Sequence, residues 1–127
     1  MPKFGKRSKK ELATAHPDLQ RLFNEVIKTF DCAVICGHRS RADQEKAVKS
    51  GASDAPWPKS DHNKTPSRAV DVVPYPSMWD DPEKFYDLAL EVKAAAHRLN
   101  IRVKWGGDYK ETAKRPAGWD KPHWYLA

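Results

Sequence analysis

The sequence predicts an α+β fold, in which helices pack on a small and largely antiparallel sheet. Segments with helical periodicity dominate the start of the chain, and the strand-like segments that follow are mostly joined by loops. At 127 residues, with 31% charged and 10% aromatic residues, the chain has the length and composition of one folded domain. We therefore interpret residues 1–127 as a single domain, in which residues 1–10 form a flexible basic arm.

Helical and strand-like patterns alternate in the first half of the chain. Apolar residues recur at a 3.6-residue spacing through residues 17–30, and Pro17 suits the first turn of a helix. The apolar run CAVIC at residues 32–36 predicts a short buried strand. A second helix is expected over residues 40–51, with Ser40 as its N-terminal cap.

The second half begins with a long polar loop over residues 52–68, and loops of this length are often functional. The next strand is expected over residues 69–75. A helix over residues 80–100 has an acidic start, an early proline and a clear apolar stripe. Two further strands are expected over residues 101–107 and 123–127, which completes the set of elements that an α+β sheet needs.

The net charge of +6 favours a polyanionic partner such as nucleic acid, a membrane surface or an anionic polymer. Apart from the N-terminal KFGKRSKK the basic residues are scattered, whereas a nucleic-acid-binding domain would concentrate them on one face. No stretch approaches the ~20 apolar residues of a membrane span. The N-terminus has no apolar core of a signal peptide. We therefore expect neither nucleic acid binding, nor stable membrane insertion, nor export.

Polar residues with metal-binding chemistry lie at or beside the predicted strands. His62 precedes the strand at 69–75, Asp71 lies inside it, and His123 begins the last strand. Imidazole and carboxylate are normal zinc ligands, and three protein ligands leave a fourth position open, as in catalytic zinc sites. Asp120, three residues before His123, is placed to take a proton from a water in that position. Spacing alone leaves ordinary surface or core positions as the alternative for each residue.

Other residues with metal-binding side chains have simpler interpretations. Cys32 and Cys36 are too few and too close for a disulfide framework, and we interpret them as reduced core thiols, with metal binding as the alternative. His16 suits a helix start and His97 a helix end, while His38 beside a strand end is left open. Five aromatic residues near the proposed site are assigned to core packing, with the lining of a cleft as the alternative: Trp57, Trp105, Tyr109, Trp119 and Trp124.

The segment SDHNKTPSRAVDVVP at residues 60–74, together with DKPHW at residues 120–124, resembles the zinc peptidases of the LAS type. These include D-alanyl-D-alanine carboxypeptidases and dipeptidases and the phage L-alanyl-D-glutamate endopeptidases. Their pattern is Ser-x-His, a short loop and Ala-x-Asp, then an acidic residue three before a second His. The matching residues here are Ser60, His62, Ala69, Asp71, Asp120 and His123. Arg39 in GHRSRADQ resembles the Gly-x-Arg segment of the same group, and the whole likeness, which spans residues 30–127, is greatest to phage endolysins.

The resemblance implies a single zinc ion with three protein ligands: His62, Asp71 and His123. It implies that Asp120 is the acid–base residue, that Arg39 binds a substrate carboxylate or the developing oxyanion, and that Ser60 hydrogen-bonds substrate. The implied reaction is hydrolysis of the L-Ala–D-Glu bond in the peptidoglycan stem peptide, which lyses the host cell. The chain would act as a monomer and stay in the host cytoplasm until it is released to the cell wall.

Two related functions are alternatives. A D-alanyl-D-alanine carboxypeptidase would share the metal site, although such enzymes usually act outside the cytoplasm. A non-catalytic, zinc-bearing wall-binding module would keep the fold, but the presence of both Asp120 and Arg39 favours a working enzyme. The chain departs from the common pattern in two ways: the loop NKTPSR is two residues longer and lacks glycine, and Asp120 replaces the more frequent Glu.

Overall fold

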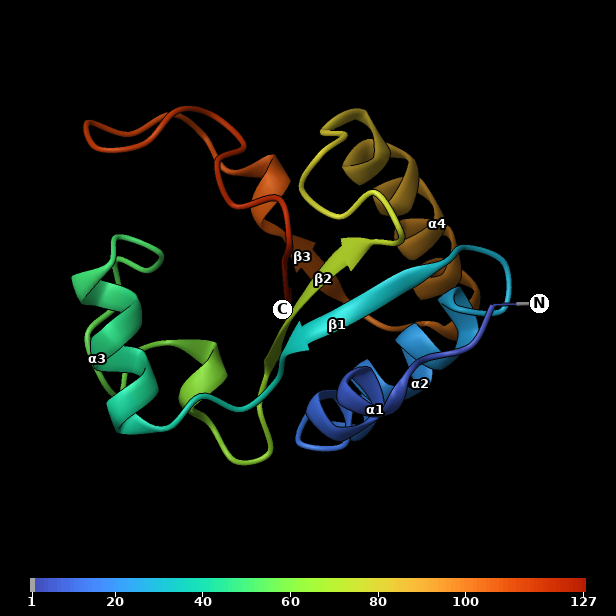
Figure 1. The fold of residues 1–127 in the computed structure, drawn as a ribbon, viewed down its shortest axis with the longest axis horizontal. Helices are drawn as coiled ribbons and strands as arrows, with labels where there is room; N and C mark the ends of the chain where they lie inside the picture. Colours follow the sequence, from blue (N-terminus) through green and yellow to red (C-terminus); the bar gives the residue numbers. More distant parts are fainter. Residues whose placement is uncertain (1) are drawn as a thin grey trace.

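The computed structural model describes residues 2–127, which form a four-stranded sheet with helices packed against it (Figure 1). The strands are β1 (Cys32–Cys36), β2 (Ala69–Pro74), β3 (Val103–Trp105) and β4 (His123–Leu126). The helices are α1 (Lys6–Leu12), α2 (Pro17–Val26), α3 (Arg41–Lys49) and α4 (Glu83–Leu99), with 3₁₀ turns η1 (Asp61–Asn63) and η2 (Gly106–Asp108). The order in the sheet is β1–β2–β4–β3, and each neighbouring pair is antiparallel. The predicted α+β fold is confirmed.

The core lies on one face of the sheet. Helix α2 packs against α4, α4 contacts β2 and β3, and α1 lies against β1. Val70 and Val72 of β2 and Trp124 of β4 are buried in this core. Because successive side chains of a strand point to opposite faces, Asp71 and His123 point away from the core. Figure 1 shows α3 apart from the other helices, at the end of β1.

The N-terminal segment differs from the flexible basic arm that we predicted over residues 1–10. Within the described residues, Lys6–Leu12 form helix α1, and Phe4 and Leu12 are buried against the core. Ser8 is also buried, and its Oγ accepts a hydrogen bond of 3.0 Å from the backbone N–H of Val34 in β1. The segment is therefore part of the domain, and its Lys and Arg side chains occupy the exposed side of a docked helix.

Two element boundaries also differ from the predictions. Helix α2 ends at Val26, although the apolar stripe continues through the following turns, where Ile27 is buried and Phe30 packs on the core. The strand predicted over residues 101–107 is confined to Val103–Trp105, because the chain enters the 3₁₀ turn η2 at Gly106. None of the helices in residues 2–127 is long and apolar enough to cross a membrane.

Candidate active site

Strand register brings together two of the predicted site residues that are far apart in the sequence. Asp71 of β2 lies directly opposite His123 of β4 and, on its other side, is paired with Cys36 of β1. Opposite residues of an antiparallel pair present their side chains on the same face, about 4.5–5.5 Å apart at Cβ. The His123 Nδ1 accordingly lies 3.3 Å from the Asp71 Oδ1. The central position of β2 makes this pair a rigid base for the site.

His62 reaches the same carboxylate from the turn η1. Ser60 caps this turn, and its Oγ accepts a hydrogen bond of 3.2 Å from the N–H of His62, while the Asn63 side chain accepts one from the N–H of Ser60. The backbone N–H of Arg39 donates to the His62 carbonyl at 2.8 Å. These contacts fix a buried imidazole whose Nε2 lies 3.2 Å from the Asp71 Oδ1.

The two imidazole rings and the Asp71 carboxylate form a donor set that suits a divalent metal ion. His62 Nδ1 lies 2.8 Å from the Gly37 carbonyl, so a neutral ring donates there and leaves Nε2 free as a ligand. Arg39 Nη2 lies 3.3 Å from the second carboxylate oxygen of Asp71. Each ligand candidate is thus fixed by a further hydrogen bond or by the strand that carries it. Metal ligands in proteins are usually oriented by such second contacts.

Charge coupling at the site perturbs two pKa values. Burial disfavours the charged form of both Asp71 and His62, but their mutual attraction outweighs it. The His62 and His123 rings hold the pKa of the Asp71 carboxyl well below its ordinary 3.8. The Asp71 carboxylate raises the pKa of His62 above its ordinary 6.5. In the absence of a metal ion a proton on His62 therefore balances the carboxylate, and a metal ion would replace that proton.

Cys36, His62 and Asp71 form a candidate metal-binding triad among the described residues, since one donor atom of each lies within 4.8 Å of the other two. The Cys36 Sγ, however, lies 3.8 Å from His62 Nδ1, the ring nitrogen that faces the Gly37 carbonyl, whereas Nε2 faces Asp71. Cys36 is therefore behind the ring, and it does not line the cleft onto which His62 and Asp71 open. Cys32 is buried in the core, as predicted.

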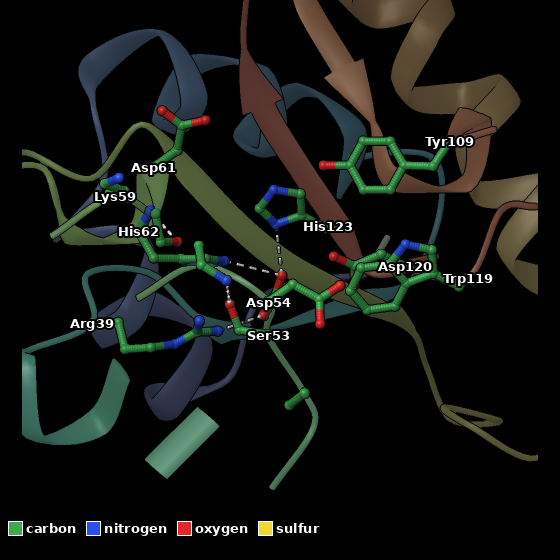
Figure 2. A pocket seen from close by; sticks show the side chains of 14 residues that line it. Arg39, Ser53, Asp54, Lys59, Asp61, His62, Tyr109, Trp119, Asp120 and His123 are labelled. Carbon is green, nitrogen blue, oxygen red and sulfur yellow. Dashed lines mark hydrogen bonds and ion pairs between the residues drawn. The ribbon is translucent and has the colours of Figure 1, made fainter. Parts of the chain in front are cut away.

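The donor set opens onto a cleft with a volume of about 240 Å³, and this cleft also contains the other predicted site residues. Arg39, Ser60 and Asp120 all line it. Figure 2 shows Arg39 on one side, and Asp120 with Trp119 and Tyr109 on the other. Burial raises the pKa of Asp120, and the nearby Asp71 carboxylate acts in the same direction. A carboxylate with a raised pKa beside a candidate metal site suits proton transfer.

A close backbone approach holds Asp120 in place. A Cβ added at Gly106 would overlap the Asp120 carbonyl oxygen and lie only 2.8 Å from the Asp120 Cβ. The Asp120 carbonyl in turn accepts a hydrogen bond of 3.1 Å from the N–H of His123. The backbone of the segment that carries Asp120 therefore packs directly against Gly106, at the start of η2.

The remaining predictions for single residues separate into core and cleft. Trp105 and Trp124 stack in the core, with ring centroids 5.5 Å apart, whereas Tyr109 and Trp119 line the cleft. Trp57 does not line it. The histidine predictions agree with the structure at His16, which caps α2 through its Nδ1, and at His97, in the last turn of α4. His38 makes a backbone hydrogen bond to Thr14.

Two contacts around the cleft have no counterpart in the sequence patterns. Gln44 of α3 is fully buried and hydrogen-bonds Arg39 at 3.0 Å. Arg115 forms a two-pronged ion pair with Asp54, at 3.1 and 3.3 Å, and its guanidinium lies 4.0 Å from the centre of the Trp119 ring. The pair joins the loop of Asp54 to the loop that leads to Trp119, and both Asp54 and Trp119 line the cleft. Arg115 and Asp54 are 61 residues apart and neither belongs to a motif, so no local sequence pattern predicts their ion pair.

The extra length between His62 and Asp71 is accommodated at the surface. Residues 64–66 are exposed, whereas His62 and Ser67, on either side of them, are buried. The N–H of Arg68 donates to the Asp61 carbonyl at 3.0 Å, which closes the base of the loop. The longer loop therefore extends into solvent and leaves both ligand candidates in place.

Comparisons with known proteins agree with this site. The sequence pattern of the family described as phage L-alanyl-D-glutamate peptidase matches residues 1–126. The chain is 30% identical to the L-alanyl-D-glutamate peptidase of Escherichia phage T5, over 89% of this chain and 90% of that protein. It also resembles the crystal structure of the Serratia marcescens L-Ala D-Glu endopeptidase ChiX, with a TM-score of 0.80 and 30% identity over 98% of this chain and 90% of that one. The chain belongs to the phage L-alanyl-D-glutamate peptidase family.

Proposed function

We propose that this L-alanyl-D-glutamate peptidase is a zinc enzyme whose ligands are His62 Nε2, Asp71 and His123 Nδ1. Its family carries the peptidase activity on peptidoglycan. The observation that supports the ligand set is the convergence of both imidazole nitrogens on one carboxylate oxygen, at 3.2 and 3.3 Å, on the floor of the cleft. Two histidines and a carboxylate with an open fourth position match the donor chemistry of catalytic zinc.

This ligand set is preferred to the triad that contains Cys36. Both sets contain His62 and Asp71. The third ligand is His123 in one set and Cys36 in the other. The Cys36 thiol approaches the rear nitrogen of His62, on the side away from the cleft, where a substrate carbonyl has no access. His123 shares the cleft with Asp71 and Asp120, so a metal ion bound to it is within reach of substrate.

Bound zinc would act as a Lewis acid toward the scissile carbonyl and make a nearby water more acidic. Asp120 is the residue that takes the proton of the attacking water and passes it to the leaving amine of D-Glu. Its raised pKa brings it closer to the working range of such a base. The Asp120 carbonyl is tied to the His123 backbone, so the base and one ligand keep a fixed relation.

Arg39 and Ser60 are proposed to bind the substrate. The Arg39 guanidinium uses one nitrogen for Asp71 and another for Gln44, and its remaining N–H donors are available for a substrate carboxylate or for the developing oxyanion. The Ser60 hydroxyl accepts from the His62 N–H, so it still has its own proton to donate.

We also propose that the enzyme is a monomer that lyses the host wall after release from the host cytoplasm.

The proposal is tested by digesting purified peptidoglycan with and without a chelator and identifying the products by mass spectrometry. The expected product has a new N-terminal D-Glu, and its formation stops when the chelator removes zinc. Release of terminal D-Ala would instead identify a D-alanyl-D-alanine carboxypeptidase. Intact wall in the presence of bound zinc would indicate a non-catalytic binding module.

Three substitutions test the ligand set. His123→Ala should lose zinc and lysis together, whereas His97→Ala, on the exposed side of α4, serves as the matched control. Cys36→Ser should keep zinc affinity within about threefold, because the thiol is not a ligand in this proposal. If Cys36→Ser loses zinc and His123→Ala keeps it, the triad with Cys36 is the metal site.

Asp120→Asn tests the base separately. It should keep zinc and lose about 10²–10⁴-fold in turnover, the usual contribution of a positioned general base. A variant that digests walls at nearly the wild-type rate would remove Asp120 from the mechanism.

A further inference from the structure

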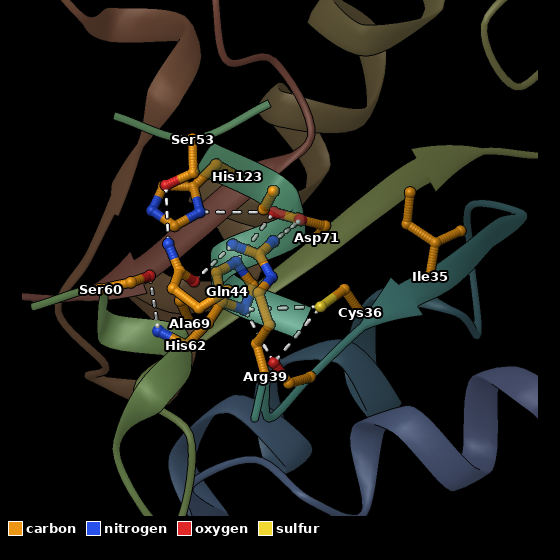
Figure 3. Close-up of polar contacts among 12 residues, drawn as sticks. Ile35, Cys36, Arg39, Gln44, Ser53, Ser60, His62, Ala69, Asp71 and His123 are labelled. Carbon is orange, nitrogen blue, oxygen red and sulfur yellow. Dashed lines mark hydrogen bonds and ion pairs between the residues drawn. The ribbon is translucent and has the colours of Figure 1, made fainter. Parts of the chain in front are cut away.

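We propose that Gln44 is a positioning residue, which fixes Arg39 against Asp71 and at the same time holds one wall of the cleft. This inference rests on the proposed function, because it concerns how the proposed substrate-binding arginine is aimed. Gln44 is the one buried residue of helix α3, and its exposed fraction is 0%. Figure 3 shows it between Arg39 and the segment that carries Ser53.

All four hydrogen-bonding positions of the Gln44 side chain are used. Its Oε1 accepts from Arg39 Nη1 at 3.0 Å and from Asn63 Nδ2 at 3.2 Å. Its Nε2 donates to the Ala55 carbonyl at 2.6 Å and to Ser53 Oγ at 3.0 Å. A glutamine has two acceptor sites and two N–H donors, so this side chain is fully satisfied although it is buried.

These four contacts lead to three separate parts of the site. Arg39 contacts Asp71 with its other terminal nitrogen, so Gln44 and Asp71 hold the guanidinium from two sides. Asn63 belongs to the turn that carries His62. Ser53 and Ala55 both line the cleft. A single amide therefore relates the arginine, a ligand-bearing turn and a cleft wall to one another.

Helix packing alone does not account for a glutamine at this position. An amphipathic helix that only needs an anchor buries apolar residues, and a buried polar group gives no more stability than an apolar one of similar shape. What a fully satisfied polar network does supply is a unique arrangement of its members. The arrangement that it fixes here is the direction of Arg39 and the position of the segment 53–55.

Two substitutions at Gln44 separate these roles. Q44M keeps the length of the side chain and removes all four hydrogen bonds, so kcat should fall and KM should rise, with kcat/KM lower by about 10–100-fold. Q44E keeps both acceptor sites for Arg39 and Asn63 but loses the two donors to the cleft wall. Its kcat should stay within about threefold of wild type while its KM rises about tenfold. The matched control is Q20M on α2, which removes the single hydrogen bond of Gln20 to the Ala15 carbonyl and should leave both constants unchanged.

A double-mutant cycle with R39A tests whether Gln44 acts through Arg39. In the R39A background Q44M should lower kcat by less than about threefold, because the group that it aims is gone. A second readout does not depend on activity: hydrogen exchange of segment 52–59 in the metal-free protein should become faster in both Q44M and Q44E and stay unchanged in Q20M.

Three results would overturn the inference: Q44M with wild-type kcat and KM, the same loss of kcat in the R39A background as in wild type, or unchanged exchange of segment 52–59. If Q44M does not fold, the split of kcat from KM in Q44E decides the question. Failure of the proposed function is a different outcome, in which the wild-type protein itself does not cleave the L-Ala–D-Glu bond or R39A is as active as wild type.

Discussion

Gly106→Ala is expected to impair catalysis although it leaves every proposed catalytic residue in the sequence unchanged. The added Cβ would lie 2.8 Å from the Asp120 Cβ and overlap the Asp120 carbonyl oxygen. Ordinary carbon–carbon contact begins at ~3.5 Å, so the segment that carries Asp120 must move by roughly 0.7 Å or more. Backbone on both sides of the contact gives little room for local relief. A displacement of ~1 Å at a positioned catalytic group costs about 10²-fold in rate, and we expect a loss of that size in kcat.

The assay is kcat on a soluble stem-peptide substrate at saturating zinc, with the melting temperature and zinc content measured alongside. Gly5→Ala is the matched control, because a Cβ there meets nothing within 4 Å. Its kcat should equal that of wild type. The reasoning is refuted if Gly106→Ala folds, binds zinc and turns over within about threefold of wild type, since Asp120 would then tolerate the displacement or have no part in the reaction.

Three further predictions concern charge and reactivity. Because its carboxylate partner raises the pKa of His62, the metal-free ion pair contributes its full stability below pH 6.5 and loses it as the pH rises through that raised pKa. A bound metal ion must displace this proton, so the affinity for zinc should increase about tenfold per pH unit between pH 6.5 and the raised pKa. A zinc affinity that stays constant over this range would contradict the prediction. Burial raises the pKa of Cys32 to about 12, so iodoacetamide at pH 8 should label Cys36 alone in the native protein and both cysteines after unfolding, as peptide mapping would reveal. Arg115→Ala should raise KM about threefold to tenfold with little change in kcat, and Asp54→Asn should do the same, because their partly exposed ion pair joins the two loops that carry Asp54 and Trp119 into the lining of the cleft. Equal salt dependence of KM in wild type and variants would argue against this role.

The sequence predicts the ligand candidates better than the network that surrounds them. His62, Asp71 and His123 have residue types that suit zinc, but their spacing alone is a weak signal, and they are recognisable because the segments that carry them resemble those of a known peptidase group. Asp71 and His123 meet through the register of β2 against β4, whereas His62 reaches them from the turn η1. Gln44 and Arg115 leave no such signal, because each acts through contacts with loops whose path only the folded chain defines.

Helix α1 shows how a local pattern can mislead. Its buried positions Ser8 and Leu12 are four residues apart, as on one face of a helix, and Phe4, just before the helix, is buried as well. Ser8 interrupts the apolar pattern between Phe4 and Leu12, and the Lys and Arg residues around it suggest a solvated arm. The serine is buried because the N–H of Val34 in β1 needs an acceptor, a requirement that no local sequence pattern contains.

The exposed loop of residues 64–66 is a suitable place to insert a foreign peptide beside the cleft. Hydrogen bonds at Arg68 and the burial of Ser67 close the loop on the side of Asp71, while the capped turn secures His62 on the other. Foreign sequence inserted between these anchors would leave the donor set undisturbed, as exposed loop tips generally tolerate insertion. A short wall-binding peptide placed there would be carried next to the catalytic cleft, which would give a lytic enzyme of 127 residues a choice of target wall without the addition of a second domain.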